Sequence, residues 1–187
     1  MMKYLKKPAV AVLLSVVIVL SSSFLSADVK LSRASRKVTD GFYQGIMYGG
    51  YKHKSISGQL DNICGAVSGL MTLAGNQGID TGELSSRNSE LSKTLSDKTA
   101  DISSVYADYS SLLDCLYPIL DTLSEADLSD RDEKGAKDYM VAIMGAEKVI
   151  DEAGYNESVQ EFAEDMSRFP ADFFLKITDT KLPEIFG

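Results

Sequence analysis

The chain contains one histidine, His53, so any histidine-dependent chemistry would have to use it. A Ser-His-Asp triad needs an imidazole as its base, and a His-ligated zinc site needs at least one imidazole nitrogen. His53 lies between Lys52 and Lys54 and follows Gly49-Gly50, a composition typical of a cationic surface loop. We therefore interpret His53 as an exposed loop residue rather than a catalytic base or a metal ligand.

Acidic side chains cluster at two places where carboxylates could hold calcium or cleave a glycosidic bond. The first cluster superficially resembles a calcium loop, but it lacks the central glycine and closing glutamate of an EF-hand; it contains Asp127, Asp130, Asp132 and Glu133. We interpret it as the solvated start of a helix capped by Ser129. The second could supply the two acids of a glycosidase, but a helical protein of this size rarely builds a sugar cleft; its members are Glu161, Glu164, Asp165 and Asp172.

No glycine-rich phosphate-binding motif, neither Gly-x-x-x-x-Gly-Lys nor Gly-x-Gly-x-x-Gly, occurs in the sequence. The two cysteines, Cys64 and Cys115, lie 51 positions apart and have no Cys or His neighbours, unlike a metal or redox motif. We therefore expect no catalytic residue, no metal site and no cofactor, and hence a protein that is not an enzyme.

The first 27 residues have the pattern of a signal peptide. Lys3, Lys6 and Lys7 precede an apolar run, Ala9 to Leu20, and Ala27 is a small residue suited to a cleavage site. The apolar run is shorter than the roughly 20 residues of a spanning helix, so cleavage after Ala27 is favoured. An uncleaved anchor remains the alternative, and membrane contact is expected only through this segment. No cysteine lies near the site, which argues against a lipid anchor.

Export makes a disulfide between Cys64 and Cys115 permissible. The alternative is two small, unpaired thiols buried in helices. The sequence leaves both alternatives open.

The charge balance argues against nucleic acid as a partner. The 187 residues contain 19 Lys and Arg against 27 Asp and Glu, for a net charge of −8. Removal of the leader takes away three lysines and no acid, which lowers the net charge to −11. A chain of this sign repels phosphate backbones, and binding to anionic lipid by charge alone is disfavoured for the same reason.

Apolar residues recur at steps of three and four through most of the mature chain, the spacing of amphipathic helices. We expect helices over 56–74, with Ser57 as N-cap, from Asp80 or Thr81 to 99, and over 102–123, 129–150 and 155–169. The second of these should have a mostly polar, solvated surface, and the fourth should place Met140 and Met144 on its apolar face. Helical spacing also continues from Val38 to Met47, where Gly49-Gly50 breaks it. Pro118 should kink its helix rather than end it. Convincing strand patterns are absent. The sequence predicts an all-α domain over residues 28–187, an antiparallel bundle of three to four long helices.

The last third of the chain resembles the LemA family. Tyr155-Asn156, followed by Val159 and Phe162, is similar to the family's Tyr-Asn-x-x-Val-x-x-aromatic motif, and Phe169-Pro170 is similar to the aromatic-proline corner that follows it. The match covers about 30 residues and is closest to divergent, exported members from Gram-positive bacteria. The departures are Ala163, where the family usually has Asn, and Asp61–Val67, where the family's Asp-Leu-Ile-Pro-Asn-Leu-Val segment is absent.

The resemblance implies a helical bundle held at or beyond the membrane by its N-terminus, and it implies no reaction. Family members are thought to work beside envelope or exported proteins, including those with a TPM domain. For Tyr155 and Asn156 we favour a structural role, in which the amide bonds a freed backbone group and the tyrosine packs its ring. Phe169-Pro170 should end a helix and fold the tail back.

Two functions therefore compete. The first is an exported interaction or scaffolding module of the cell envelope. The alternative is an extracytoplasmic bundle that binds a small molecule or peptide, indicated by the tyrosines Tyr43, Tyr48, Tyr51, Tyr106, Tyr109 and Tyr117. Tyrosines suit binding faces, although the last three could equally belong to the core.

Overall fold

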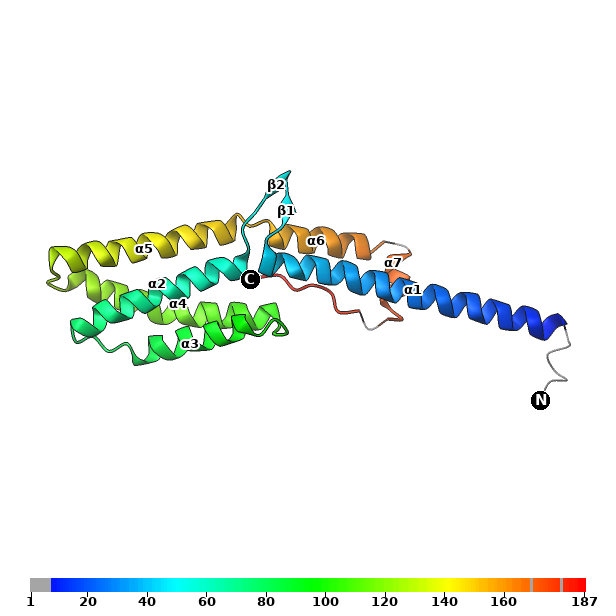
Figure 1. Ribbon diagram of the computed structural model, residues 1–187, viewed down its shortest axis with the longest axis horizontal. Coiled ribbons are helices and arrows are strands. Elements are labelled where there is room, and N and C mark those ends of the chain that lie inside the picture. The colour runs from blue at the N-terminus through cyan, green and yellow to red at the C-terminus, as the bar shows by residue number, and fades with distance from the viewer. Residues whose placement is uncertain (1–7, 169, 179) are drawn as a thin grey trace. The chain divides into compact units, whose positions relative to one another are not determined.

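The computed structural model describes residues 8–168, 170–178 and 180–187 and is mostly helical, which confirms the all-α class (Figure 1). The chain divides into two compact units. One holds the chain up to Val38 together with Gln160–Pro183, and the other holds Thr39–Val159 together with Glu184–Gly187. The division falls within helix α1 (Pro8–Gln44) and within helix α6 (Tyr155–Met166).

The larger unit contains four long helices: α2 (Ile56–Asn76), α3 (Gly82–Ser96), α4 (Ile102–Glu125) and α5 (Asp130–Asp151). Helix α2 packs along α5 and α3, and α3 packs along α4 (Figure 1). Their buried side chains follow the predicted stripes and include Leu60, Ile63, Val67, Leu70, Leu84, Leu91, Val105, Leu112, Leu116 and Ile143. Burial of these stripes against one another provides most of the stabilisation, because isolated helices of this length are marginal in water.

The helix ends confirm some predicted caps and correct others. Ser129 caps α5 as expected: its hydroxyl oxygen accepts a hydrogen bond from the Asp132 N–H at 3.2 Å and donates to the Asp132 carboxylate at 2.8 Å. The prediction for α2 was wrong by two positions, because Ser55 rather than Ser57 accepts the bond from the Gly58 N–H. Ser55 precedes the helix in an extended conformation, as an N-cap must, whereas Ser57 already lies in the first turn and is buried.

Two further features of these helices bear on the predictions. Helix α4 continues through Pro118, so the proline does not end it. The polar surface expected for α3 is only partly correct, since Asn88 is buried. Its amide donates to the Cys64 carbonyl oxygen at 3.2 Å and to the Ser68 hydroxyl at 3.1 Å, and thereby ties α3 to α2.

A short hairpin interrupts the helices where helical spacing was expected to continue to Met47. Helix α1 ends at Gln44, and strand β1 (Met47–Tyr48) pairs with β2 (Tyr51–Lys52). The two turn glycines, Gly49 and Gly50, have φ of 58° and 83°, a left-handed pair that closes a two-residue hairpin. His53 follows β2, and its N–H donates to the Ile46 carbonyl oxygen at 2.8 Å. His53 is half-buried in this arrangement, not exposed as expected.

The smaller unit combines the first part of α1, the end of α6 and the short helix α7 (Ala171–Leu175). Phe24 on α1 lies against Phe173 and Phe174, with ring centroids 6.5 and 5.9 Å away. The hydroxyl of Thr180 donates to the Asp28 carboxylate at 3.3 Å. Helix α1 therefore runs through the expected cleavage site, and its residues beyond that site hold the C-terminal segment of this unit.

Lys3, Lys6, Lys7 and Phe169 lie outside the described residues. Among the helices that the structure describes, none is both long enough and apolar enough to cross a membrane.

Candidate functional site

The candidate site begins at the break between α5 and α6, where Gly154 lies. Gly154 adopts a φ of 68°, a left-handed conformation that separates the end of α5 from the first residue of α6, Tyr155. The ring of Tyr155 is buried against that of Phe42, with centroids 5.7 Å apart. Its hydroxyl donates to the Glu184 carbonyl oxygen at 2.9 Å. Burial, and then the charge of Glu184, raise the pKa of Tyr155, which therefore stays neutral and able to donate.

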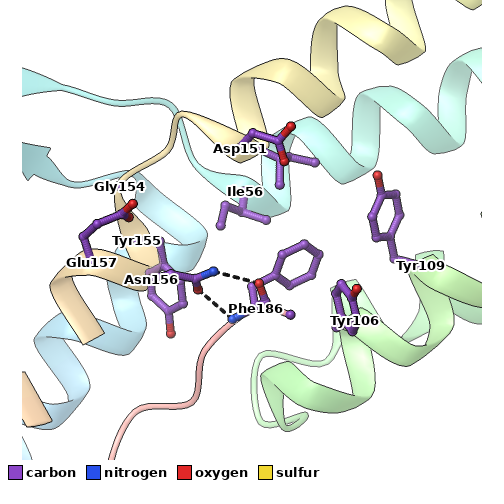
Figure 2. A pocket seen from close by; sticks show the side chains of 11 residues that line it. Ile56, Tyr106, Tyr109, Asp151, Gly154, Tyr155, Asn156, Glu157 and Phe186 are labelled. Carbon is purple, nitrogen blue, oxygen red and sulfur yellow. Dashed lines mark hydrogen bonds between the residues drawn. The ribbon is translucent and has the colours of Figure 1, made fainter. Parts of the chain in front are cut away.

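Asn156, the residue after Tyr155, binds the backbone of Phe186, which lies two residues after Glu184. Its Oδ1 accepts a hydrogen bond from the Phe186 N–H at 2.8 Å, and its Nδ2 donates to the Phe186 carbonyl oxygen at 2.9 Å (Figure 2). We call these bonds, together with the Tyr155–Glu184 bond, the C-terminal clasp. The clasp fixes Glu184–Gly187 to the larger unit, because it satisfies both polar groups of Phe186 within the protein.

The ring of Phe186 forms the centre of an aromatic cluster. It is buried, and its centroid lies 5.2 Å from that of Tyr106, 5.6 Å from that of Phe42 and 5.8 Å from that of Tyr109. The contact with Tyr106 is edge-to-face, the arrangement that aromatic quadrupoles favour. Helices α1 and α4 and the last residues of the chain therefore meet around one side chain.

A pocket of about 340 Å³ opens beside this cluster (Figure 2). We call it the clasp pocket. Its apolar walls come from Ile56, Ile150 and the rings of Tyr106, Tyr109 and Phe186, and its polar lining comes from Asp151, Asn156 and Glu157. No Lys, Arg or His is among its lining residues. The pocket therefore combines aromatic walls with negative charge.

Acidic groups also surround the tyrosine hydroxyls on the same side of α4. The hydroxyls of Tyr109 and Tyr117 both donate to Glu147 Oε1, each at 3.2 Å. Burial raises the pKa of Tyr109, and the charges of Glu147 and Asp151 raise it further. Of the tyrosines expected in the core, Tyr109 is buried, whereas Tyr106 and Tyr117 expose part of their rings.

A second, more open hollow of about 460 Å³ lies between α2 and α5. Its lining includes Asn62, Gly65, Tyr139 and Gly145. Its only charged lining residue is Lys54, so it lacks the paired carboxylates of the clasp pocket.

The other described residues of the LemA-like motif follow Asn156 along α6 and beyond it. Val159 is buried one turn after Tyr155, Phe162 is half-buried, and Pro170 precedes α7. Phe169 lies outside the described residues.

The structure shows both cysteines as free thiols, with Cys64 buried on α2 and Cys115 partly buried on α4.

Within the described residues, no group of three or more His, Cys, Asp or Glu side chains could hold a metal ion. The sequence also gave little indication of two residues that shape the clasp pocket. Asp151 is one acid among many, and Phe186 is one of several apolar residues in the tail.

Comparisons of the chain with protein-family models, with curated proteins and with solved structures found no match.

Proposed function

We propose that this protein is an exported, non-enzymatic module that binds another protein, and that its four long helices form an antiparallel bundle. The observation that carries the proposal is an uncovered apolar row on α5. Met140, Val141 and Met144 are 38, 69 and 61% exposed, although Met140 and Met144 were expected on the buried face of this helix. Clustered exposed apolar side chains mark interaction sites more often than isolated ones do.

The row continues toward α4 at Tyr117, which is 49% exposed and bonded to Glu147, one turn after Met144. Flexible methionines and an amphipathic tyrosine adapt to the surface of a partner. We call Met140, Val141, Met144 and Tyr117 the α5 patch.

Charge complementarity indicates the kind of partner. No Lys, Arg or His occurs between Lys98 and Arg131, a stretch that includes all of α4 and contains seven acids. A partner segment that is both basic and apolar would bury the α5 patch and compensate these acids. We propose an envelope or exported protein with such a segment. A TPM-domain protein is the choice that the LemA resemblance favours, and membership of that family is itself part of the proposal.

We also propose that the protein is exported and cleaved after Ala27, because its first 27 residues have the pattern of a signal peptide. The mature protein would then begin at Asp28, within α1, and would keep the contact between Asp28 and Thr180.

A site-specific photo-cross-linker tests the proposal. We would place it at Met144 in the α5 patch and, as a matched control, at Glu83 on α3, whose side chain is 74% exposed. We expect one envelope or exported protein to cross-link from Met144 but not from Glu83. A synthetic basic peptide from that protein should compete in low salt and lose affinity in high salt.

Equal cross-linking from both positions, or a partner without a basic segment, would contradict the proposal. The N-terminal peptide recovered in the same experiment tests export separately, since a mature chain is expected to start at Asp28.

A second candidate function is the binding of a small molecule or peptide. The specific observation that favours it is the clasp pocket, whose volume of about 340 Å³ lies in the range of small-ligand sites.

A further inference from the structure

We propose that the clasp pocket binds a small organic cation, an ammonium group carried on a compact apolar body. This inference rests on the second candidate function and names its class of ligand. It stands on residues that the α5 patch does not contain.

Three aromatic rings form walls of the clasp pocket. Tyr106 and Tyr109 are adjacent on α4, with ring centroids 6.4 Å apart and planes inclined by 59°. Phe186 meets Tyr106 at an interplanar angle of 89°, so the three rings line one side of the pocket at different angles (Figure 2). The π faces of such rings carry negative potential and attract a cation within about 6 Å.

The charged residues that line the clasp pocket are both acidic. Asp151, the last residue of α5, and Glu157, in the first turn of α6, bring two carboxylates to the lining, and no lining residue is cationic. The charge of Asp151 reaches the Tyr109 hydroxyl, where it contributes to the raised pKa of that group. The nearest lysine on α5, Lys148, is 3.9 Å from the Glu152 carboxylate, which partly compensates its charge. The pocket therefore disfavours anions and attracts cations.

Apolar surface and size distinguish an organic cation from a metal ion. Ile56 and Ile150 are buried side chains that contribute to the lining, and they carry no atom that could coordinate a metal ion or bond its water shell. Methyl or methylene groups of the ligand would be removed from water against them. A volume of about 340 Å³ suits a molecule of a few heavy atoms together with some water.

Because Asn156 and Phe186 belong both to the lining and to the clasp, a bound cation should also hold the clasp closed.

Titration of the full chain with two matched probes tests the proposal. Choline carries a quaternary ammonium, and 3,3-dimethylbutan-1-ol has the same shape without the charge. We expect saturable binding of choline, followed by NMR or calorimetry, and binding of the neutral alcohol at least about fivefold weaker, as the loss of a cation–π contact and a charge attraction implies.

Single substitutions test how much the ring of Tyr106 and the carboxylate of Asp151 each contribute to choline binding. Tyr106→Leu and Asp151→Asn should each weaken choline binding by about 2- to 10-fold. Tyr106→Phe, which keeps the ring, should retain binding. Tyr117→Leu and Asp138→Asn make the same changes outside the lining and should have no effect. All altered side chains are exposed or partly exposed, and thermal unfolding confirms that each variant folds.

Equal affinity for the two probes, or no saturable binding by choline, tetramethylammonium or butylammonium, would overturn the inference. Cross-linking from Met144 in the Tyr106→Leu variant separates the two proposals. Loss of cation binding with cross-linking retained is expected if both are correct, and cross-linking that disappears would show that they share one site.

Discussion

The side-chain amide of Asn156 pairs with the backbone of Phe186 as a peptide group of a neighbouring strand would, accepting from its N–H at 2.8 Å and donating to its carbonyl oxygen at 2.9 Å. The two residues are 30 positions apart. Only an amide carries both a donor and an acceptor in this geometry, so no other side chain of similar size can make the same pair of bonds.

Replacement of Asn156 should destabilise the larger unit. Asn156→Ala removes both bonds to Phe186, and we expect a loss of about 1–3 kcal/mol in the free energy of unfolding. Asn156→Asp keeps the acceptor but puts a negative oxygen beside the Phe186 carbonyl, so it should cost at least as much. Urea unfolding followed by circular dichroism measures both. The surface control is Asn76→Ala at the end of α2, and an equal loss there would argue against the clasp.

Phe186 and its neighbour Ile185 provide a test of the aromatic cluster. Phe186 is 6% exposed and contacts three rings, whereas Ile185 is 48% exposed. Phe186→Ala should destabilise the protein by about 3–5 kcal/mol, the cost of a cavity in a core. Ile185→Ala should cost less than about 1 kcal/mol. Denaturant midpoints at constant m-value measure the difference, and similar midpoints would mean that the last residues are not packed in solution.

Two glycines of α2 should respond in opposite directions to the same substitution. A Cβ on Gly69 would collide with the ring of Tyr139 on α5, whereas a Cβ on Gly65 meets nothing within 4 Å. Gly69→Ala should therefore lower stability by about 1–3 kcal/mol, because the helices must separate or the ring must move. Gly65→Ala should raise it by about 0.5–1 kcal/mol, because alanine is the better helix former. Melting temperatures that shift in the same direction would contradict the close approach of α2 and α5.

Stability should fall in strong alkali through the buried tyrosines. Burial and nearby carboxylates raise the pKa of Tyr109 and Tyr155 above the ordinary value of about 10. Above pH 10 the unfolded chain loses these protons while the folded chain keeps them, so the free energy of unfolding decreases as pH rises. The slope is at most about 1.4 kcal/mol per pH unit for each tyrosine.

Urea unfolding between pH 9 and 11 measures this slope. Tyr109→Phe removes one titrating hydroxyl, so it should reduce the slope by up to about 1.4 kcal/mol per pH unit. Tyr51→Phe, on the exposed hairpin, should leave the slope unchanged. A slope that does not respond to Tyr109→Phe would contradict the burial of its hydroxyl.

Local patterns in the sequence were sufficient for most of the helices. The stripe around Leu112 and Leu116 predicted α4, and Ser129 with Asp132 predicted the start of α5, because periodicity and capping act within a few residues. The same reasoning failed at the hairpin, where the Gly49-Gly50 turn outweighed a weak helical spacing. It also failed at Met140 and Met144, because a pattern shows that a face is apolar but not whether another element covers it.

The sequence by itself determined the helical class, the helix breaks and the acidity of the chain, and it indicated that Tyr155 and Asn156 have a structural role. Only the tertiary structure decided which partners they take. The bonds to Glu184 and Phe186 join positions about 30 residues apart. The clasp pocket likewise combines α2, α4, α5, α6 and the last residues, and no local pattern specifies how they meet. That arrangement depends on how the helices pack, which is a property of the whole unit rather than of any segment.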